Sequence, residues 1–549
     1  MQKYFDFHFH PVFKAFISDF EAKYPTNRLS KDFIKAFELS NALMDFVDSE
    51  LLHILEGQSS LEQIKQGNFT LGVANIAPIE RFFSYKNGFF GKFLNSRMLT
   101  SPMDHRLMDV VREGEISYYQ LFLREIQVYH LLNQNGTVHL LTRKKNGFVE
   151  GGTNLVIGIE GGHALHRAKI GTYSKEDQME THKEDELSRD FSNHPILTPA
   201  DSLRHLHDAM WEMDMDIFSL VLTHLSNVNE SFLATHAYGM KLLDVEESYP
   251  AGNGLSRKGK LVIDAAYQMK RGAQDTPIII DIKHMSLKSR LDFYEYRKNN
   301  NYQQYPIIAS HMGVTGYSIS EWQEATKKVR VEQEADLPKI GIFTEREMAG
   351  KWGAFNNVFT YNSWSINLMD EDIVEILQSG GLIGISLDVR ILGWQNMLTK
   401  EEQMEYISVE DFKYFFPEKY RQFEGLQPQE VESWLIPVRE ERHPLSLCFN
   451  LLHIISVGKL YTDKNPWDHV CLGSDFDGLI NPMINCRNST KSKDLGPLLL
   501  RWLPVAEIAY RNENAGPILL DKSVDKLEMV VSKFLYTNGF NFVANRGFM

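Results

Sequence analysis

The residues with the clearest capacity for chemistry are two histidines near the N-terminus. Residues 3–10 read KYFDFHFH and predict a strand. Strand side chains alternate between faces, so the three phenylalanines should share one face, while His8 and His10 share the other. Pro11 then ends the strand, because proline has no backbone N–H to donate. Neutral imidazole suits zinc-like ions, which makes the pair a candidate start of a divalent metal site.

Seven more segments read as strands and could carry the remaining ligands. They are residues 69–77, 154–160, 216–224, 277–284, 306–311, 381–387 and 469–475. Most are near-continuous apolar runs, which is typical of parallel strands buried on both faces. Strands that alternate with helical segments predict a parallel sheet, and eight of them predict a closed (β/α)8 TIM barrel of the α/β class. An open doubly wound sheet is the alternative, although no Gly-rich phosphate-binding motif follows any strand.

Titratable residues recur at the ends of six of the eight predicted strands. They are His8 with His10, Glu160, His224, His284, His311 and Asp475. In a barrel all C-terminal strand ends open on the same face, where catalytic groups lie. Solvent-facing end residues would explain one or two of these positions but not six. We therefore expect a shared metal site at the mouth of the barrel.

This set of side chains exceeds what one tetrahedral ion uses. It suits two divalent ions, with zinc as the expected metal, bridged by a carboxylate and a water. Such a pair lowers the pKa of the bound water and polarises a scissile carbonyl group. Asp475 is the candidate proton shuttle, which accepts the water's proton and passes it to the leaving nitrogen.

The composition of the chain limits the kinds of binding partner and the cellular compartment that we expect. The chain has 549 residues and a net charge of −14, which argues against nucleic acid as a main partner. Its three cysteines cannot form a disulfide framework, so a reduced compartment is the simpler interpretation. There is no basic-then-apolar leader, and no apolar run appears long enough to span a membrane. We therefore expect a cytoplasmic protein without a membrane span.

The chain is expected to form one barrel domain over residues 1–549, enlarged by three insertions. The insertions are residues 78–135, 314–359 and 393–443. They follow the second, sixth and seventh predicted strands, so they should lie over the mouth of the barrel and reshape its pocket.

Six short motifs point to a known family. They are IEGGHAL (159–165), LTH (222–224), GLSRKG (254–259), DIKHMS (281–286), SHMG (310–313) and GSDFDG (473–478). In the same order, they resemble motifs of the membrane dipeptidase (renal dipeptidase) family of the amidohydrolase superfamily. The resemblance runs from residue 3 to about residue 480, with long insertions. It implies a binuclear zinc barrel that cleaves dipeptides, and homodimers are common in that family.

The resemblance also implies individual roles. One metal would be held by His8, His10 and Glu160, and the other by Glu160, His284 and His311, so that Glu160 bridges the two. His224 would match the histidine that holds the substrate and its tetrahedral intermediate. Asp475 would match the acid/base.

Three departures from the family pattern concern the metal site and the substrate. The family's first motif is usually His-x-Asp, where this chain has His8-Phe9-His10. The arginine that binds the substrate's carboxylate in the family is replaced by Ile366. A family tyrosine is replaced by Asp388, and Arg390 is a candidate carboxylate anchor, since arginine binds carboxylates through two parallel hydrogen bonds.

Lys283 is expected on the opposite strand face from His284, in a structural ion pair. The sequence as a whole predicts a metal-dependent hydrolase of a dipeptide-like substrate. One alternative is another amidohydrolase reaction on an N-acyl amino acid, a cyclic amide or a lactone. Another is a metal-loaded barrel without catalysis, and a mononuclear deaminase is a weaker third.

Overall fold

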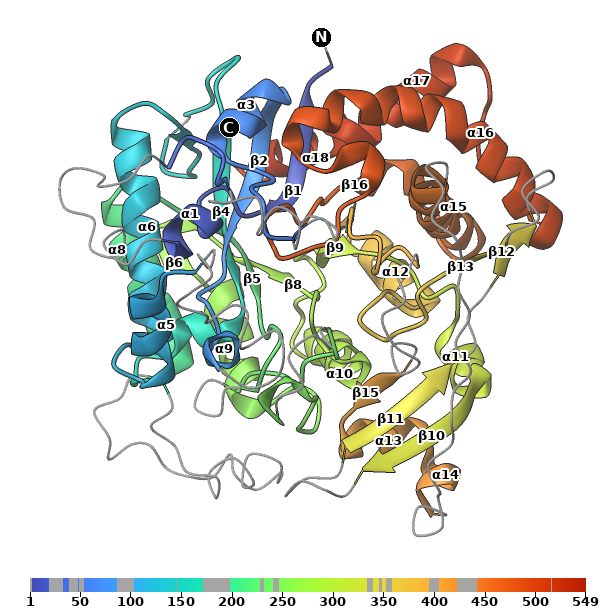
Figure 1. Ribbon diagram of the computed structural model, residues 1–549, viewed down its shortest axis with the longest axis horizontal. Coiled ribbons are helices and arrows are strands. Elements are labelled where there is room, and N and C mark those ends of the chain that lie inside the picture. The colour runs from blue at the N-terminus through green and yellow to red at the C-terminus, as the bar shows by residue number, and fades with distance from the viewer. Residues whose placement is uncertain are drawn as a thin grey trace.

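The computed structural model describes residues 2–18, 33–38, 48, 54–85, 103–145, 147–170, 198–227, 232–239, 246–332, 339–344, 348–351, 358–393, 404–421, 442–514 and 516–549. Within them, eight parallel strands form a barrel (Figure 1). In spatial order they are β1 (Tyr4–Phe9), β2 (Phe69–Ile76), β4 (Asn154–Glu160), β5 (Ile217–Val221), β8 (Ile279–Asp281), β9 (Ile308–Met312), β14 (Leu382–Ile385) and β16 (Val470–Leu472). A short strand, β3 (His139–Leu140), also pairs with β4.

The barrel closes between its first and last strands. Phe9 pairs in parallel with Phe476, and the Asp475 N–H donates to the carbonyl of His8 at 2.8 Å. The buried Asp6 carboxylate strengthens this seam by accepting the Ser474 N–H at 2.8 Å. The predicted (β/α)8 TIM barrel is therefore confirmed.

Helices alternate with these strands along the chain. Those that precede β5 are α1 (Phe13–Ile17), α3 (Leu61–Gln66), α5 (His105–Arg112), α6 (Tyr118–Gln134) and α8 (Pro199–Glu212). Those between β5 and β16 are α9 (Arg257–Tyr267), α10 (Leu287–Asn299), α11 (Ile319–Ala325), α12 (Asp370–Gln378), α13 (Val409–Phe415), α14 (Pro417–Arg421) and α15 (Arg442–Tyr461). The chain ends with α16 (Leu495–Asn514), α17 (Val524–Ser532) and α18 (Asn538–Ala544).

Helix α15 is long and apolar enough to cross a membrane by length and composition. The expectation that no apolar segment reaches that length is wrong for this helix. However, 83% of its apolar window is buried inside the molecule, and it packs against α12 and α16. That burial is typical of a core helix in a large domain.

One hydrophobic cluster contains buried side chains from all eight barrel strands. Its members are Phe5, Phe7, Leu71, Val73, Val156, Phe218, Ile279, Ile308, Leu382 and Cys471, joined by Phe542, Val543 and Phe548 from the C-terminal segment. Phe9 belongs to a different cluster, so the expectation of one shared phenylalanine face is wrong. The reason is a register shift between Asp6 and Phe9 in the pairing of β1 with β2, which interrupts strict alternation.

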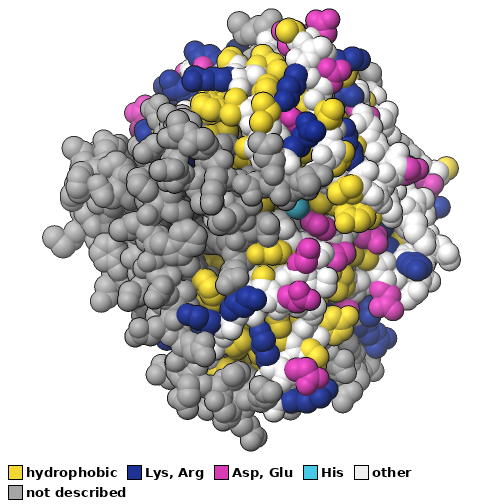
Figure 2. All heavy atoms as spheres, turned by 90° about the vertical axis from the view of Figure 1, so that its right-hand side faces the viewer, with side chains coloured by type: hydrophobic (Ala, Val, Ile, Leu, Met, Phe, Trp, Pro, Cys, Tyr) yellow, Lys and Arg dark blue, Asp and Glu magenta, His cyan; other side chains and the backbone are white. Residues whose placement is uncertain are grey.

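Two of the expected insertions combine in a small antiparallel sheet. It contains β10 (Thr326–Glu332), β11 (Lys339–Thr344) and β15 (Glu405–Ile407), and Figure 1 shows it beside α13 and α11, at the edge of the molecule. Two further strand pairs are β12 (Met348–Lys351) with β13 (Val358–Thr360) and β6 (Lys270–Arg271) with β7 (Gln274–Asp275). On the face drawn in Figure 2, basic, acidic and hydrophobic side chains of the described residues are intermixed.

Candidate metal centre

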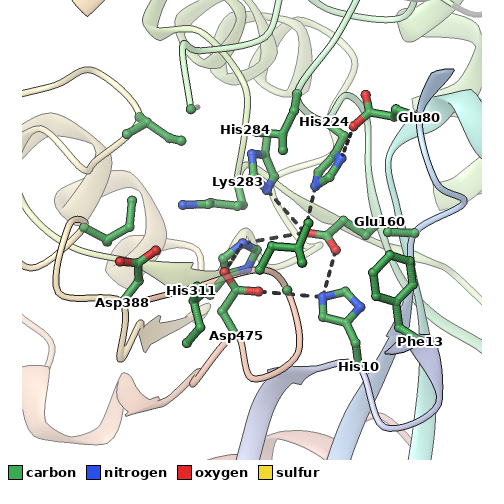
Figure 3. Close-up of a pocket in the computed structure, with 18 of the residues that line it drawn as sticks. His10, Phe13, Glu80, Glu160, His224, Lys283, His284, His311, Asp388 and Asp475 are labelled. Carbon is green, nitrogen blue, oxygen red and sulfur yellow. Dashed lines mark hydrogen bonds and ion pairs between the residues drawn. The ribbon is translucent and has the colours of Figure 1, made fainter. Parts of the chain in front are cut away.

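The predicted metal ligands converge at the C-terminal ends of the barrel strands (Figure 3). His8, Glu160 and His311 lie on β1, β4 and β9, and His10 follows β1 directly. His224, His284 and Asp475 each lie three residues beyond the end of their strands. His284 and Asp475 have φ angles of +66° and +64°, so the chain has left the extended conformation there. These side chains are therefore aimed by turns rather than by strand alternation.

Glu160 is the centre of the arrangement. One of its oxygens lies 3.2 Å from Nε2 of His8 and 3.2 Å from Nε2 of His284. The other lies 3.2 Å from Nε2 of His10. Nε2 of His311 and of His224 lie 3.6 and 3.7 Å from the first oxygen. A carboxylate in contact with five imidazoles is placed at the centre of a candidate metal site.

Three triads among the described residues have donor atoms within 4.8 Å of one another. They are His8, Glu160 and His311; His8, His10 and Asp475; and Glu160, His224 and His284. Histidine nitrogens with carboxylate oxygens are the donor set that zinc-like ions take. The residues present therefore fit divalent metal. The geometry also groups His224 with Glu160 and His284, where the resemblance implies a substrate contact.

Most of these imidazoles are oriented by a second partner through Nδ1. Ser310 Oγ lies 2.9 Å from Nδ1 of His8 and 2.8 Å from Nδ1 of His311. Nδ1 of His10 lies 3.0 Å from the carbonyl oxygen of Asn75. Such partners fix the ring orientation and leave Nε2 directed at the centre, as is usual for metal-ligating histidine.

Glu80 performs the same task for His224. Its carboxylate lies 2.7 Å from Nδ1 of His224 and accepts the Ser226 hydroxyl at 2.5 Å. Burial alone would raise the pKa of Glu80, but His224 outweighs it and holds the pKa at about 2. Sequence reasoning missed Glu80, because it lies four residues beyond β2, inside an expected insertion. An acidic residue so soon after a barrel strand was the available signal.

The electrostatics of the centre favour an added positive charge. Burial lowers the pKa of His10, but Glu160 and Asp475 outweigh it and raise that pKa to about 10. Burial would raise the pKa of Glu160, yet the surrounding imidazoles hold it well below its ordinary value. Burial lowers the pKa of both His284 and His311 far below the ordinary value, which leaves these rings neutral. Neutral imidazoles beside an ionised carboxylate are ready to bind a cation.

Asp475 lies at the edge of the centre, 3.6 Å from Nε2 of His10 and 3.8 Å from Nε2 of His311. Its side chain is 14% exposed, against 2% for Glu160, so it faces the cavity that a substrate would enter. Burial raises the pKa of Asp475, and the ion pair with His10 opposes this. A carboxyl group that is partly accessible and whose pKa is raised is suited to proton transfer.

The expectation for Lys283 is wrong on both counts. Because β8 ends at Asp281 and His284 has a positive φ, Lys283 lines the same cavity as His284 rather than the opposite face (Figure 3). Its ammonium group makes no hydrogen bond or ion pair with any residue in the described part of the chain. Burial lowers the pKa of Lys283 to about 8, although Asp475 and Asp388 act in the opposite direction.

Arg390 also lines the cavity, but its guanidinium group is engaged. It donates from Nε to both oxygens of Asp388 at 3.0 Å, and a terminal N–H donates to Asp388 at 2.6 Å. A second bond runs to the carbonyl oxygen of Leu479 at 3.1 Å. Its role as a carboxylate anchor stays a prediction.

The cavity over the centre has a volume of about 710 Å³, counted to its open mouth. Its walls are partly apolar, with Phe13, Phe83, Leu225, Ile366 and Leu479 among the lining residues. Of the three expected insertions, residues 78–135 contribute Pro78, Ile79, Glu80 and Phe83 to this wall. The described residues of the other two contribute none, so their predicted place over the mouth is not seen among them.

Neither family models nor curated proteins match the chain. Among solved structures, it is similar to dipeptidase AC, a metallopeptidase of family M19, at 13% identity and a TM-score of 0.44, over 99% of this chain and 98% of that one. It is similar to a metallopeptidase from Rhodobacter sphaeroides at 13% identity and a TM-score of 0.44, over 93% and 99% of the two chains. It is also similar to the probable dipeptidase PvdM from Pseudomonas aeruginosa at 13% identity and a TM-score of 0.43, over 89% and 88%.

Proposed function

We propose that the protein is a metal-dependent hydrolase that cleaves the amide bond of a dipeptide or a dipeptide-like molecule. The observation that carries this proposal is the convergence of five imidazoles on Glu160, with Asp475 beside them, in one cavity at the mouth of a barrel. A binding protein without catalysis has no need of a partly exposed carboxyl group next to its metal ligands.

Two divalent ions, with zinc as the proposed metal, fit this donor set. His8 and His10 would hold one ion, His284 and His311 the other, and Glu160 would contribute to both. Ions bound there activate a water molecule and polarise a carbonyl group. The remaining chemistry belongs to the chain. Asp475 accepts a proton from the attacking water and donates it to the leaving nitrogen, and His224, oriented by Glu80, donates to the oxygen on which negative charge develops.

The proposed substrate class rests on the ordered motifs of residues 159–478 and on the cavity. The cavity opens to solvent and combines apolar walls with a few polar groups, as binding sites for small molecules usually do. The apolar wall formed with Phe83 and Leu225 can accommodate an aliphatic or aromatic side chain. We also propose a cytoplasmic location, since the three cysteines are buried and unpaired.

The first test is metal content per chain by elemental analysis, paired with turnover of a mixed panel of dipeptides. We expect about two ions and dipeptide cleavage. Glu160→Gln should lose one or both ions and abolish turnover, because the carboxylate that contacts the five imidazoles is gone. Full activity of this variant, or a wild type without metal, would count decisively against the mechanism.

A second candidate is another amidohydrolase reaction, and one observation favours it. Ile366 lines the cavity at the position where the resemblance places an arginine that binds the substrate's carboxylate. N-acyl amino acids, cyclic amides and lactones should therefore be included in the panel. If the protein binds two ions and turns over only these compounds, the proposed function becomes this second reaction class.

A further inference from the structure

Among the described residues that line the cavity, one cationic side chain has no hydrogen-bond or ion-pair partner, and it lies next to the metal centre. Lys283 is only 1% exposed, yet it lines the cavity together with His284. Consecutive Cα atoms are about 3.8 Å apart, so the two side chains start from neighbouring points. Figure 3 shows the Lys283 side chain extending into the space between His284 and Asp388.

The carboxylates around Lys283 are all bound to other groups. Asp388 is held by the guanidinium group of Arg390, and Asp281 accepts the backbone N–H of Lys283 at 3.0 Å and that of Ser310 at 3.2 Å. Glu160 and Asp475 face the imidazoles of the centre. A buried ammonium group without a partner is unfavourable by several kcal/mol in general, so a ligand that brings a negative charge would be stabilised there.

The local charge indicates which anion fits. Lys283 and Arg390 carry two positive charges and Asp388 one negative charge, so this side of the cavity has a net charge of +1. A monoanion balances it, whereas a dianionic phosphate would leave an excess beside Asp475 and Glu160. Because Lys283 adjoins a proposed metal ligand, the anion must lie close to the bond that is cleaved. In a dipeptide, the α-carboxylate is one carbon away from the nitrogen of that bond.

We propose that Lys283 is the specificity residue that binds the free α-carboxylate of the substrate, on the leaving-amine side of the cleaved amide. This inference rests on the proposed hydrolase function and deepens it, because it selects dipeptides and N-acyl amino acids over lactones and uncharged cyclic amides. Ile366 lines the same cavity and can supply apolar contact, and Lys283 supplies the charge.

The test measures binding separately from turnover. In a zinc-loaded Asp475→Asn background, calorimetry compares L-Ala-L-Ala and L-Ala-D-Ala with their C-terminal amides. We expect at least one of the two dipeptides, as the free acid, to bind more tightly than its C-terminal amide. Adding Lys283→Met should raise the Kd of that acid by about 10–100-fold, as for loss of one charge-assisted hydrogen bond, and change the Kd of its amide by less than about threefold. Lys283→Arg should restore part of the preference, and Lys464→Met, an exposed site, should change nothing.

The inference is overturned if Lys283→Met weakens the binding of the free dipeptide and of its amide equally. It is also overturned if the Asp475→Asn protein does not prefer the free dipeptide, or if neither compound binds. Loss of the preference in Arg390→Met, but not in Lys283→Met, would likewise overturn it and assign the anchor to Arg390. Lys283→Gln provides a second neutral variant should Lys283→Met fail to fold. Absence of turnover with an intact, Lys283-dependent preference would instead refute the proposed function alone.

Discussion

His224 could act as a metal ligand or as a contact to the substrate, and a single substitution distinguishes these two roles. Its Nε2 lies 3.7 Å from Glu160, within reach of a metal-binding triad, and its Nδ1 is held by Glu80. We expect His224→Ala to retain both ions and to lower kcat by roughly 10²–10³-fold, because a donor to the developing negative charge is lost. Metal analysis and steady-state kinetics on the same preparation provide the measurement.

The control for this prediction is Glu80→Gln, which keeps the side-chain shape but weakens the orientation of His224. It should lower kcat by about 10–100-fold, as changes in the partner of a functional histidine usually do. If His224→Ala instead loses one ion per chain, His224 is a ligand and the substrate-contact role is wrong.

Asp475 permits a separate prediction, because it lies at the edge of the metal centre and is not one of the proposed ligands. Asp475→Asn should keep about two ions and lower kcat by roughly 10²–10⁴-fold, the usual contribution of a general acid/base. The loss should be smaller for substrates with a better leaving group, since proton donation then matters less. An equal loss for amide and activated ester substrates would contradict the proton-shuttle role.

Whether the sequence predicts the position of a site residue depends on the local backbone conformation. His8, Glu160 and His311 lie on strands or strand ends, so period-two patterns place them. Lys283 was misplaced because the turn after β8 has a left-handed residue that no hydropathy pattern reveals. Glu80 was missed because it acts through another side chain. Its place four residues beyond β2 was a weaker signal than a titratable residue at the strand end itself.

At the scale of elements, the eight barrel strands are predictable because each is a short apolar run bounded by turns. The sheet of β10, β11 and β15 was not predicted, because β11 and β15 are separated by more than sixty residues and come from two different insertions. Pairing between distant segments depends on tertiary contacts that local propensity does not encode.

The loop after β16 is fixed by a buried ion pair, which predicts a loss of stability. Asp477 lies 2.9 Å from the ammonium group of Lys14, and both side chains are 4% exposed. The same carboxylate accepts the backbone N–H groups of Gln58 and Ser59 at 2.9 and 2.7 Å. Asp477→Ala leaves Lys14 buried without this partner, so we expect a loss of about 3–5 kcal/mol and a melting temperature lower by a few degrees.

Thermal melting of Asp477→Ala and Asp477→Asn side by side tests this. Asparagine keeps an acceptor oxygen but removes the charge, so it should fall between the wild type and alanine. A melting temperature for Asp477→Ala equal to that of the wild type would show that the hydrogen bonds that Lys14 already donates to the carbonyl groups of Ile54 and Glu56 are sufficient for it.

Glu405 on β15 predicts a pH dependence of stability. It is buried, and its two oxygens accept the N–H of Ser365 at 2.8 and 2.9 Å. Burial raises its pKa from 4.5 to about 7, although Ser365 opposes the shift. The folded state therefore holds this proton more tightly than the unfolded state. The resulting stability is fully present below pH 4.5 and is lost as the pH rises through about 7.

Glu405→Gln removes this titration while keeping an acceptor for Ser365. The free energy of unfolding of the variant minus that of the wild type, measured by denaturant unfolding, should therefore become more positive between about pH 5 and pH 8, by an amount on the order of 2 kcal/mol. A difference that is constant with pH would mean that Glu405 stays ionised in the fold.

At the scale of the whole molecule, the barrel joins ligands that are far apart in the sequence. His8, Glu160 and His311 lie on β1, β4 and β9, and the seam between the first and last strands closes the sheet. A metal ion that binds residues of different strands in the folded state but not in the unfolded chain should stabilise the closed barrel by linkage. The stability of the entire fold should therefore depend on metal.

We expect chelation to lower the melting temperature and added Zn²⁺ to restore it in a concentration-dependent manner. A hundredfold excess over the Kd corresponds to about 2.7 kcal/mol for one site. If two ions share Glu160, the recovery should saturate near two equivalents, and Glu160→Gln should abolish most of it. Saturation at one equivalent would indicate that His10, in place of an acidic ligand, supports only one ion. A melting temperature unaffected by chelator and by Zn²⁺ would mean that the cluster of imidazoles stabilises the barrel without metal, and the binuclear hydrolase would have to be abandoned.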